Sequence, residues 1–239
     1  HRSPYNSRNH EYYSEDAVLT SGQAVAFISG GKEYGVIIAP KHLAFNDTEI
    51  NRLGVSVFMT EQQARENELR GTQASIEDAG ALGVMTAFNR VGITATNAHT
   101  GLLKNILRGE WGFKGLESQD FIMNPNYAVL KEYALNGGTM TTFTGENTMA
   151  AVSEKFAYWT TENVGQDTEL MSAIKQAMTW QAYALANSNA LDGMASSTRL
   201  VSVRTWYDNA LVAVQVVFAA LTVLAAAMYV LNDRKSKKQ

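Results

Sequence analysis

The chain has 239 residues, of which 46% are hydrophobic and 18% are charged, and its net charge is -3. It is long enough for one sizeable domain or two small ones, and without a surplus of basic residues we expect no nucleic-acid partner. The absence of cysteine excludes disulfides, thiol nucleophiles and Cys-ligated metals, and the four histidines show no close ligand spacing, so we expect neither a metal site nor a cofactor.

The chain begins with His1, and its first twenty residues contain no apolar signal-peptide core. We interpret this start as a cut through a longer polypeptide. The upstream part of the same protein is therefore an expected partner of the chain.

Short apolar runs then alternate with helical patterns, as is typical of βα units around a parallel sheet. The predicted strands are 34–40, 81–88, 113–119 and 138–143. The predicted helices are 59–80, which opens with a capping box of Thr60 and Gln63, then 100–108, 126–135 and 167–186. Four strands are half of those in an eight-stranded barrel, which usually needs about 250 residues. The sequence therefore predicts an α/β fold, half of a (β/α)8 TIM-like barrel.

The last predicted helix of this part has Asp167 as its N-cap. Its apolar residues are expected on or near one face, and they are Leu170, Met171, Ile174, Met178 and Leu185.

The strongest physical signal is the segment 210–231, which has 22 residues and no charge. At about 1.5 Å per residue it covers the roughly 30 Å hydrocarbon core of a bilayer. Trp206, Tyr207 and Tyr229 stand where interfacial aromatic residues lie. The alternative, a buried core helix, seldom runs this long without a charge. We therefore predict a single transmembrane helix that contacts membrane lipid.

The tail 232–239 carries four basic residues against Asp233, a net charge of +3, so the remainder of the chain sums to -6. By the positive-inside rule the tail is expected in the cytoplasm and the barrel part outside the cell. The expected organisation is a single-pass cell-membrane protein with a barrel part (1–150), a last barrel helix and juxtamembrane spacer (151–205), a transmembrane helix (206–231) and a cytoplasmic tail (232–239).

Polar residues follow three of the predicted strands. They are Lys41 with His42, Asn89 and Arg90 after Phe88, and Asp120. The C-terminal ends of barrel strands form the rim on which active sites are built. A carboxylate and cations on that rim suit a polyhydroxylated substrate, because charged groups hydrogen-bond strongly to sugar hydroxyls.

Spacing alone leaves other uses of these residues open. Asp120 has the position of a helix N-cap, and His42 that of a satisfied core histidine. Arg8 and Arg52 fit surface ion pairs equally well.

Four motifs in order resemble glycoside hydrolase family 3. SRNHEYYSED (7–16) is similar to GRNxExxSED, KHLAFNDTEINR (41–52) to KHFxxNxQExNR, and VMTAFNRV (84–91) to VMTSYNxV. LESQDF, after NILRGEWGFKG, resembles the stretch that ends in the family's nucleophile. The resemblance covers residues from about 2 to about 145 and is weak after about 150. It implies the later, C-terminal half of the catalytic barrel of a retaining, β-glucosidase-like enzyme.

The resemblance implies roles for individual residues. Asp120 is the nucleophile that attacks the anomeric carbon of an oligosaccharide or glycoside substrate. The substrate-binding residues are Arg8, Lys41, His42, Arg52, Met85, Phe88 and Phe121. The cations among them, Arg8, Lys41 and Arg52, are expected to lower the pKa of Asp120. Asp47 and Glu49 are interpreted as loop or capping residues.

Four positions depart from the family pattern. Phe88 replaces a tyrosine and so lacks a hydroxyl that could hydrogen-bond the nucleophile, and Phe121 replaces a tryptophan. Ser7 replaces a turn glycine. Glu117 stands in a strand where the family has an aliphatic residue, and a buried unpaired carboxylate is costly. These changes bear on rate and substrate range, and they leave open whether activity has been lost.

Retention of configuration needs a second carboxyl group, an acid/base, roughly 5 to 5.5 Å from the nucleophile. No residue of the chain is assigned to it. The resemblance is closest to members in which a sandwich domain precedes the barrel, so the acid/base is expected upstream of His1. Residues 1–239 alone are therefore expected to hydrolyse no glycoside at a useful rate.

Three functions follow from these observations. The first is an exo-acting β-glycosidase that releases single sugars at the outer face of a cell. The second is a non-catalytic sugar-binding surface protein, and the third a membrane-anchored structural or adhesion protein. The presence of Asp120 distinguishes the glycosidase from the other two functions. The presence of Arg8, Lys41 and His42 distinguishes a sugar-binding protein from a structural or adhesion protein.

Overall fold

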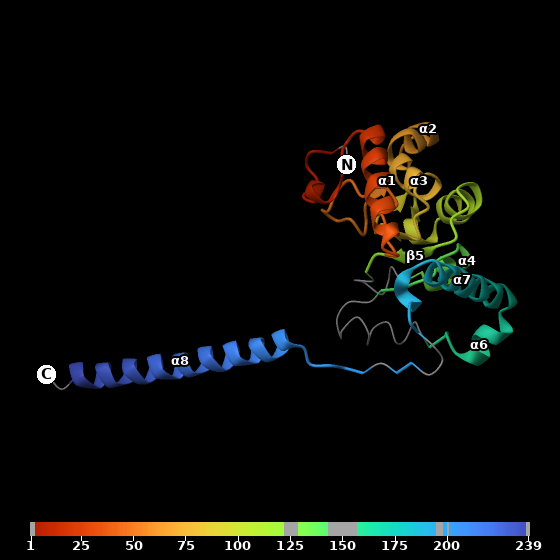
Figure 1. Ribbon diagram of the computed structural model, residues 1–239. Helices are drawn as coiled ribbons and strands as arrows, with labels where there is room; N and C mark the ends of the chain where they lie inside the picture. The colour runs from red at the N-terminus through yellow and green to blue at the C-terminus, as the bar shows by residue number, and fades with distance from the viewer. Residues whose placement is uncertain (1–2, 122–128, 143–156, 195–197, 200, 238–239) are drawn as a thin grey trace. The chain divides into compact units, whose positions relative to one another are not determined.

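The computed structural model describes residues 3–121, 129–142, 157–194, 198–199 and 201–237 (Figure 1). The chain divides into two compact units, His1–Asp192 and Gly193–Gln239. Each unit is described by itself.

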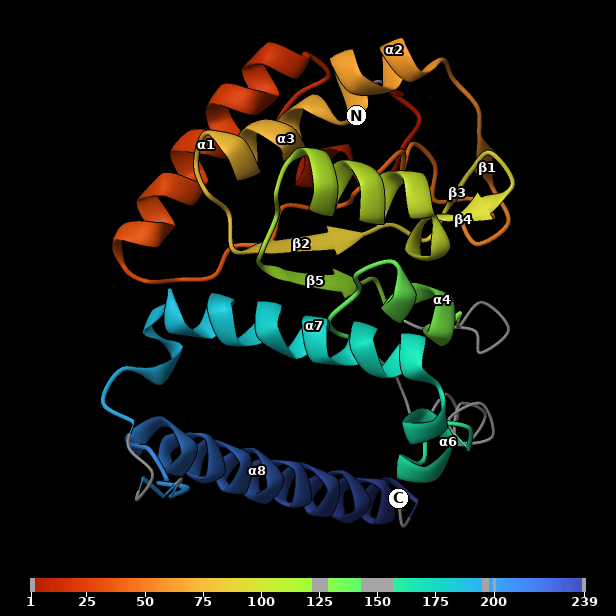
Figure 2. The ribbon, with the colours of Figure 1, turned by 90° about the vertical axis from the view of Figure 1, so that its right-hand side faces the viewer.

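A parallel array of extended segments lies at the centre of the first unit. Strand β2 (Gly83–Thr86) pairs in parallel with β5 (Leu116–Gln119). Single parallel bridges extend the array on both sides, from Leu43 to Thr86 and from Ser118 to Met140. The spatial order of the four segments is therefore their order in the chain, as expected for consecutive βα units. Figure 2 shows β2 and β5 side by side, with α1 and α3 beyond one edge of the pair and α7 beyond the other.

The first predicted strand, 34–40, was placed too early in the chain. Gly35 still belongs to the turn that ends α1, with its N–H donating to Lys32 O at 2.9 Å and its φ at +69°. Pairing begins only at Pro40, whose carbonyl accepts from Met85 N at 3.1 Å, and continues at Leu43, which donates to Met85 O at 2.8 Å. The segment 41–42 therefore lies within the paired region, and not after it.

The other three predicted strands are shorter than expected, and of 81–88 only Gly83–Thr86 forms a strand, β2. β5 begins at Leu116, because the carbonyls of Phe113 and Gly115 accept from Arg108 Nη1 at 3.0 and 2.9 Å. Of the predicted strand 138–143, only Met140 forms a bridge, and Phe143 lies outside the described residues.

The predicted helix 59–80 is confirmed as a succession of α2 (Glu61–Gln63), the π-helical η2 (Ala64–Glu68) and α3 (Arg70–Glu77). The Thr60 hydroxyl accepts from Gln63 N at 3.2 Å, as the capping box predicts. The predicted helix 100–108 is the π-helical η4 (Gly101–Glu110). α4 (Leu130–Leu135) covers the described end of the predicted helix 126–135, whose residues 126–128 lie outside the description.

Helix α7 (Thr168–Ala186) follows the short α6 (Thr161–Gln166) and matches the predicted helix. Asp167 caps it by accepting from Leu170 N at 3.0 Å. Its buried face consists of Leu170, Ala177 and Ala184, which repeat every seven residues. The expectation for Met178 was wrong, since this residue is 62% exposed.

Helix α1 (Ala17–Glu33) was not predicted from the sequence. Its N-cap is Asp16, which accepts from Leu19 N at 2.7 Å, but its glycines lower its intrinsic helix propensity. The helix is held by packing against α3. The two approach closely where a Cβ on Gly71 of α3 would lie only 2.7 Å from Thr20 Cγ2 of α1.

The remaining elements of this unit are short. β1 (Ser56–Val57) pairs in parallel with β3 (Arg90–Val91), which forms a hairpin with β4 (Thr94–Ala95). Single 3-10 turns occur at η1 (Asn9–Glu11), η3 (Thr96–Ala98) and η6 (Asn189–Leu191).

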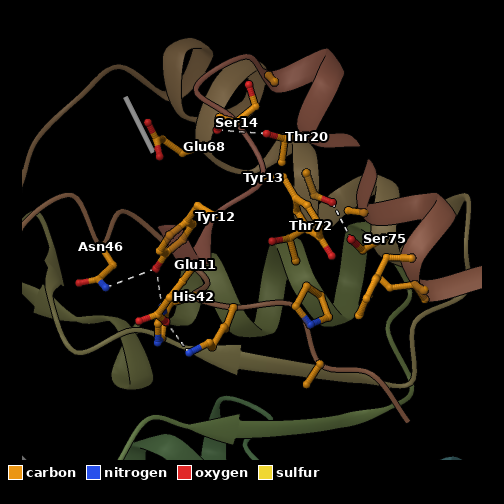
Figure 3. Close-up of a pocket in the computed structure, with 18 of the residues that line it drawn as sticks. Glu11, Tyr12, Tyr13, Ser14, Thr20, His42, Asn46, Glu68, Thr72 and Ser75 are labelled. Atoms are coloured by element: carbon orange, nitrogen blue, oxygen red, sulfur yellow. Dashed lines mark hydrogen bonds and ion pairs between the residues drawn. The ribbon is translucent and has the colours of Figure 1, made fainter. Parts of the chain in front are cut away.

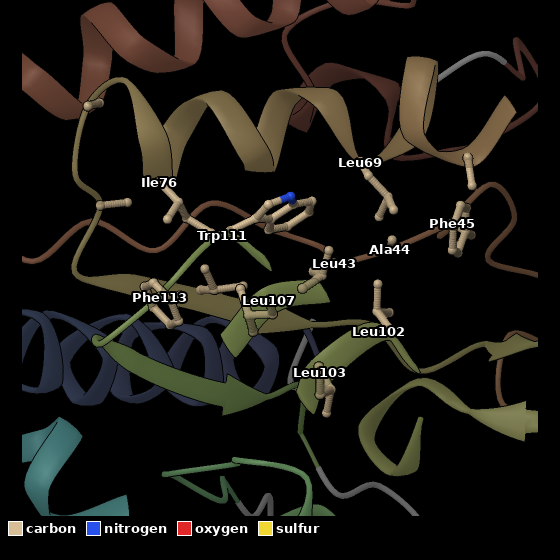
Figure 4. Packing of buried hydrophobic residues seen from close by; sticks show 14 of the residues in the cluster. Leu43, Ala44, Phe45, Leu69, Ile76, Leu102, Leu103, Leu107, Trp111 and Phe113 are labelled. Atoms are coloured by element: carbon tan, nitrogen blue, oxygen red, sulfur yellow. The ribbon is translucent and has the colours of Figure 1, made fainter. Parts of the chain in front are cut away.

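The hydrophobic core lies between the strands and the helices α3 and η4 (Figure 4). Its fully buried aliphatic residues include Leu43 from the first segment, Val84 from β2, and Leu103 and Leu107 from η4. These contacts fix the segment that carries residues 41 and 42 against β2, and so fix one side of the candidate site.

The second unit contains α8 (Trp206–Ser236). Its stretch Trp206–Asp233 has 28 residues and contains an 18-residue window with a mean hydropathy of 2.4, so it is long and apolar enough to cross a membrane.

Candidate active site

Asp120 lies directly after β5, at the carboxyl end of the parallel array. Its N–H continues the pairing by donating to Thr86 O at 3.2 Å, and its side chain is only 8% exposed. One carboxylate oxygen accepts from Phe121 N at 2.8 Å, and the other lies 3.3 Å from His42 Nε2.

The electrostatic surroundings keep Asp120 ionised. Burial acts to raise its pKa, but the hydrogen bonds from His42 and from Phe121 N, together with the charge of Arg52, outweigh burial and hold the pKa below its ordinary value. A buried carboxylate that remains charged has the form that a glycosidase nucleophile needs.

His42 is enclosed between Tyr12 and Asp120. Its side chain is 1% exposed, with Nε2 facing Asp120 and Nδ1 lying 2.5 Å from the hydroxyl of Tyr12. The peptide bond that precedes His42 is cis. His42 is therefore buried, as a core histidine would be, but one of its two polar contacts is with the candidate nucleophile.

Five charged side chains form a continuous series that we call the ion-pair chain. Lys41 Nζ lies 2.9 Å from Glu11 Oε2, and Arg8 binds both oxygens of Glu11 at 2.8 and 2.7 Å. Arg8 also lies 3.3 Å from Glu49 Oε1, while Arg52 lies 2.9 Å from Glu49 Oε2. The hydrogen bonds from Arg8 and Lys41 hold the pKa of Glu11 well below its usual range. Two glutamates thus fix the positions of three cations.

The ion-pair chain bears on two expectations. Glu49 was interpreted as a loop or capping residue, and it does lie in a loop, where its carboxylate joins Arg8 to Arg52. Arg8 and Lys41 were expected to lower the pKa of Asp120, but they are paired with Glu11, and Arg52 is the cation that acts on Asp120.

Apolar groups complete the surroundings. The guanidinium carbon of Arg52 lies 4.5 Å from the centre of the Phe88 ring, a cation–π contact. Met85 is partly buried on β2, and Phe121 is 44% exposed. The structure thus brings Asp120 together with His42, Arg52 and the adjacent Phe121, while the substrate-binding roles of all these residues stay predictions.

A cavity of about 220 Å³ borders the site (Figure 3). Its walls include residues of α1 and α3 and also Glu11, Tyr12, Lys41, His42 and Asn46. Tyr12 and His42 both line the cavity, and the Nε2 edge of the His42 ring faces Asp120. Within the described ranges, no group of three His, Asp or Glu side chains is placed to hold a metal ion.

The sequence reasoning missed Glu11 and Tyr12 as well as Glu49. For the two glutamates a signal was present, since each is a fixed letter of a motif and stands three residues from an arginine, Arg8 or Arg52. Tyr12 occupies a variable position of its motif, so nothing in the sequence marked it.

Comparisons with known proteins agree on one family. Residues 1–156 match the model of the glycosyl hydrolase family 3 N terminal domain. A beta-glucosidase of Rhizobium radiobacter is 40% identical over 121 residues, 51% of this chain and 15% of that protein. Beta-glucosidase B of Emericella nidulans is also 40% identical over 121 residues, 51% of this chain and 14% of that protein.

Among solved structures, beta-glucosidase 3B from Thermotoga neapolitana in complex with alpha-D-glucose matches with a TM-score of 0.68 and 27% identity, over 80% of this chain and 26% of that one. The chain thus spans about 15% of the length of the curated relatives cited here. The α/β fold class is confirmed as that of the family's barrel domain. Because the family model matches well over half of its residues, the chain belongs to glycosyl hydrolase family 3.

Proposed function

We propose that the chain supplies the nucleophile and part of the sugar-binding site of a retaining, exo-acting β-glycosidase. The observation that carries the proposal is Asp120, a buried carboxylate with a lowered pKa at the end of a parallel strand in a member of this family. Residues 1–150 would be the later half of the catalytic barrel.

In the proposed reaction, the Asp120 carboxylate attacks the anomeric carbon while the bond to the leaving oxygen breaks. The leaving oxygen takes a proton from the acid/base, and a covalent glycosyl-enzyme forms. Water, deprotonated by the same acid/base, then attacks the anomeric carbon and releases the sugar and Asp120. The two inversions give net retention.

We assign the proton donor to a carboxyl of the complete protein other than those of the described site. Glu11 and Glu49 are the acidic side chains nearest to the substrate-binding cations, and both are engaged in ion pairs. The lowered pKa of Glu11, caused by its hydrogen bonds from Arg8 and Lys41, keeps it ionised and unable to donate a proton.

The substrate class follows from the charges and the relatives. The ion-pair chain presents three fixed cations, which suit the hydroxyls of a sugar. Curated relatives are beta-glucosidases, and one solved neighbour holds glucose. A β-linked glucoside or oligosaccharide is therefore the proposed substrate.

We predict that the complete protein hydrolyses an aryl β-glucoside with retention. Proton NMR of the first product should show β-glucose before mutarotation, because two displacements occur at the anomeric carbon. An initial α-anomer would contradict a covalent intermediate at Asp120. Binding of glucose without turnover would favour the alternative, a non-catalytic sugar-binding protein, in which the missing hydroxyl at Phe88 is one of the losses.

A second part of the proposal concerns α8, which we propose spans the cell membrane with the tail in the cytoplasm. It is supported by the 28-residue apolar stretch Trp206–Asp233 and by the net charge of +3 on residues 232–239.

The topology prediction is tested with protease on intact cells. An epitope on the tail should be protected and an epitope before residue 193 digested, and both should be digested in lysed cells as the control. Digestion of the tail with protection of the first unit would show the opposite orientation.

A further inference from the structure

A second series of side chains, which we call the hydrogen-bond chain, ends at the nucleophile. Asn46 Nδ2 lies 3.1 Å from Glu49 Oε1 and 3.4 Å from the Tyr12 hydroxyl. That hydroxyl lies 2.5 Å from His42 Nδ1, and His42 Nε2 lies 3.3 Å from Asp120 Oδ2. Figure 3 shows Asn46, Tyr12 and His42 in succession along the wall of the cavity.

The orientation of the Asn46 amide determines the direction of donation. A carboxylate only accepts hydrogen bonds, so the NH2 group of Asn46, and not its oxygen, must face Glu49. Asn46 Oδ1 is buried without a hydrogen-bond partner among the described residues, which is the cost of this orientation. Since the same Nδ2 faces the Tyr12 hydroxyl, the oxygen of Tyr12 is the acceptor there.

Tyr12 has one hydroxyl proton, and its oxygen accepts from Asn46. The proton is therefore directed at His42 Nδ1, which lies 2.5 Å from the hydroxyl oxygen. In a neutral imidazole one nitrogen accepts and the other donates. With Nδ1 accepting, the ring proton is on Nε2, where it faces a carboxylate oxygen of Asp120. The opposite tautomer would set two lone pairs against each other at 3.3 Å.

We propose that Tyr12 is a positioning residue that fixes the ring proton of His42 on Nε2 and so directs a hydrogen bond to the nucleophile Asp120. Its kinetic consequence rests on the proposed function, whereas the proton position does not. Three charged groups act on the hydrogen-bond chain. Arg8 lowers and Glu11 raises the pKa of Tyr12, and Arg52 lowers the pKa of Asp120. Tyr12 acts through His42.

The test is Tyr12→Phe, which keeps the ring and removes only the hydroxyl. The matched control is Tyr13→Phe, because Tyr13 is the neighbouring tyrosine, is 45% exposed and packs against Phe27. Nitrogen-15 NMR of labelled histidine, with the signal assigned by His42→Gln, should show Nδ1 of His42 as a hydrogen-bonded acceptor and Nε2 as protonated. Tyr12→Phe should abolish the hydrogen-bond shift at Nδ1, and Tyr13→Phe should retain it.

The complete protein gives the kinetic readout. Tyr12→Phe should lower kcat/KM roughly 3- to 10-fold, the scale of one hydrogen bond. It should also move the acid limb of the pH profile to higher pH, because a weaker hydrogen bond to ionised Asp120 raises the pKa of that carboxyl. Tyr13→Phe should leave both unchanged.

Two results would overturn the inference. One is an NMR spectrum in which His42 Nδ1 carries a proton at neutral pH. The other is a Tyr12→Phe enzyme with an unaltered acid limb. If the NMR result is as expected and the unaltered protein has no turnover, the proposed function fails while the assignment of the His42 proton stands.

Discussion

Replacing Asp120 by glycine is expected to lower kcat/KM of the complete protein toward an aryl β-glucoside by at least about 10⁴-fold, the scale of loss when a hydrolase loses its nucleophile. The loss follows from the chemistry, since among the described residues Asp120 is the carboxylate that pairs with His42 at this strand end. Added azide should restore part of the rate and give an α-glucosyl azide, because the small anion enters the space left by the side chain and attacks the same face of the sugar.

The matched control is Asp78→Gly, the same substitution at an exposed aspartate that follows α3. It should keep essentially the activity of the unaltered protein. A folded Asp120→Gly protein that retains more than a tenth of the activity, or one that azide does not rescue although it binds glucose, would contradict the assignment.

The second large effect is expected at Glu117, whose side chain is fully buried in β5. Neither carboxylate oxygen has a hydrogen-bond partner among the described residues, as the sequence led us to expect. Burial raises the pKa of Glu117 from its usual value of 4.5 to about 7, and the positive charge of Arg108 offsets only part of this rise. Arg108 is itself partly buried, and this desolvation lowers its pKa to about 10.

The sign of the pH effect follows from these values. Below pH 4.5 Glu117 is protonated in both the folded and the unfolded chain. Between pH 4.5 and about 7 the unfolded chain releases this proton while the folded chain keeps it, so stability falls as pH rises. Above about pH 7 the loss is complete and amounts to about 3 kcal/mol.

Glu117→Gln should therefore remove this dependence and Glu117→Leu should be more stable than the unaltered chain at pH 8. Both effects are measured as free energies of unfolding at pH 5 and pH 8. The protein is denatured with urea in a mild detergent, and unfolding is monitored by tryptophan fluorescence. The control is Glu132→Gln, an exposed glutamate of α4. An equal decline in stability from pH 5 to pH 8 for Glu117→Gln and the unaltered chain would show that Glu117 does not titrate in this interval.

Local sequence patterns were sufficient for elements whose signals are themselves local. The Thr60 capping box and the Asp167 N-cap each bind an amide three residues away, so both helix starts could be predicted. The start of pairing at Pro40 could not, because it depends on where α1 ends. α1 itself escaped prediction because its glycines weaken the helical signal and its stability comes from α3, about 50 residues later in the chain.

The same distinction holds for the candidate site. Asp120 and His42 could be named from motifs, since each follows or lies beside a strand of the array. The partners of the cations could not, because Arg8 meets Glu49 across 41 residues and Lys41 meets Glu11 across 30. Only the folded chain shows that Tyr12 reaches His42.

The most direct test of the central claim is covalent trapping with a 2-fluoro glucoside that carries a good leaving group. The fluorine slows hydrolysis of the glycosyl-enzyme, so the intermediate accumulates, and peptide mapping then locates the sugar. We predict that the complete protein is labelled once, on Asp120, and that free glucose slows the labelling. A label on any other carboxylate, for example Glu11, would contradict the assignment of Asp120 as the nucleophile.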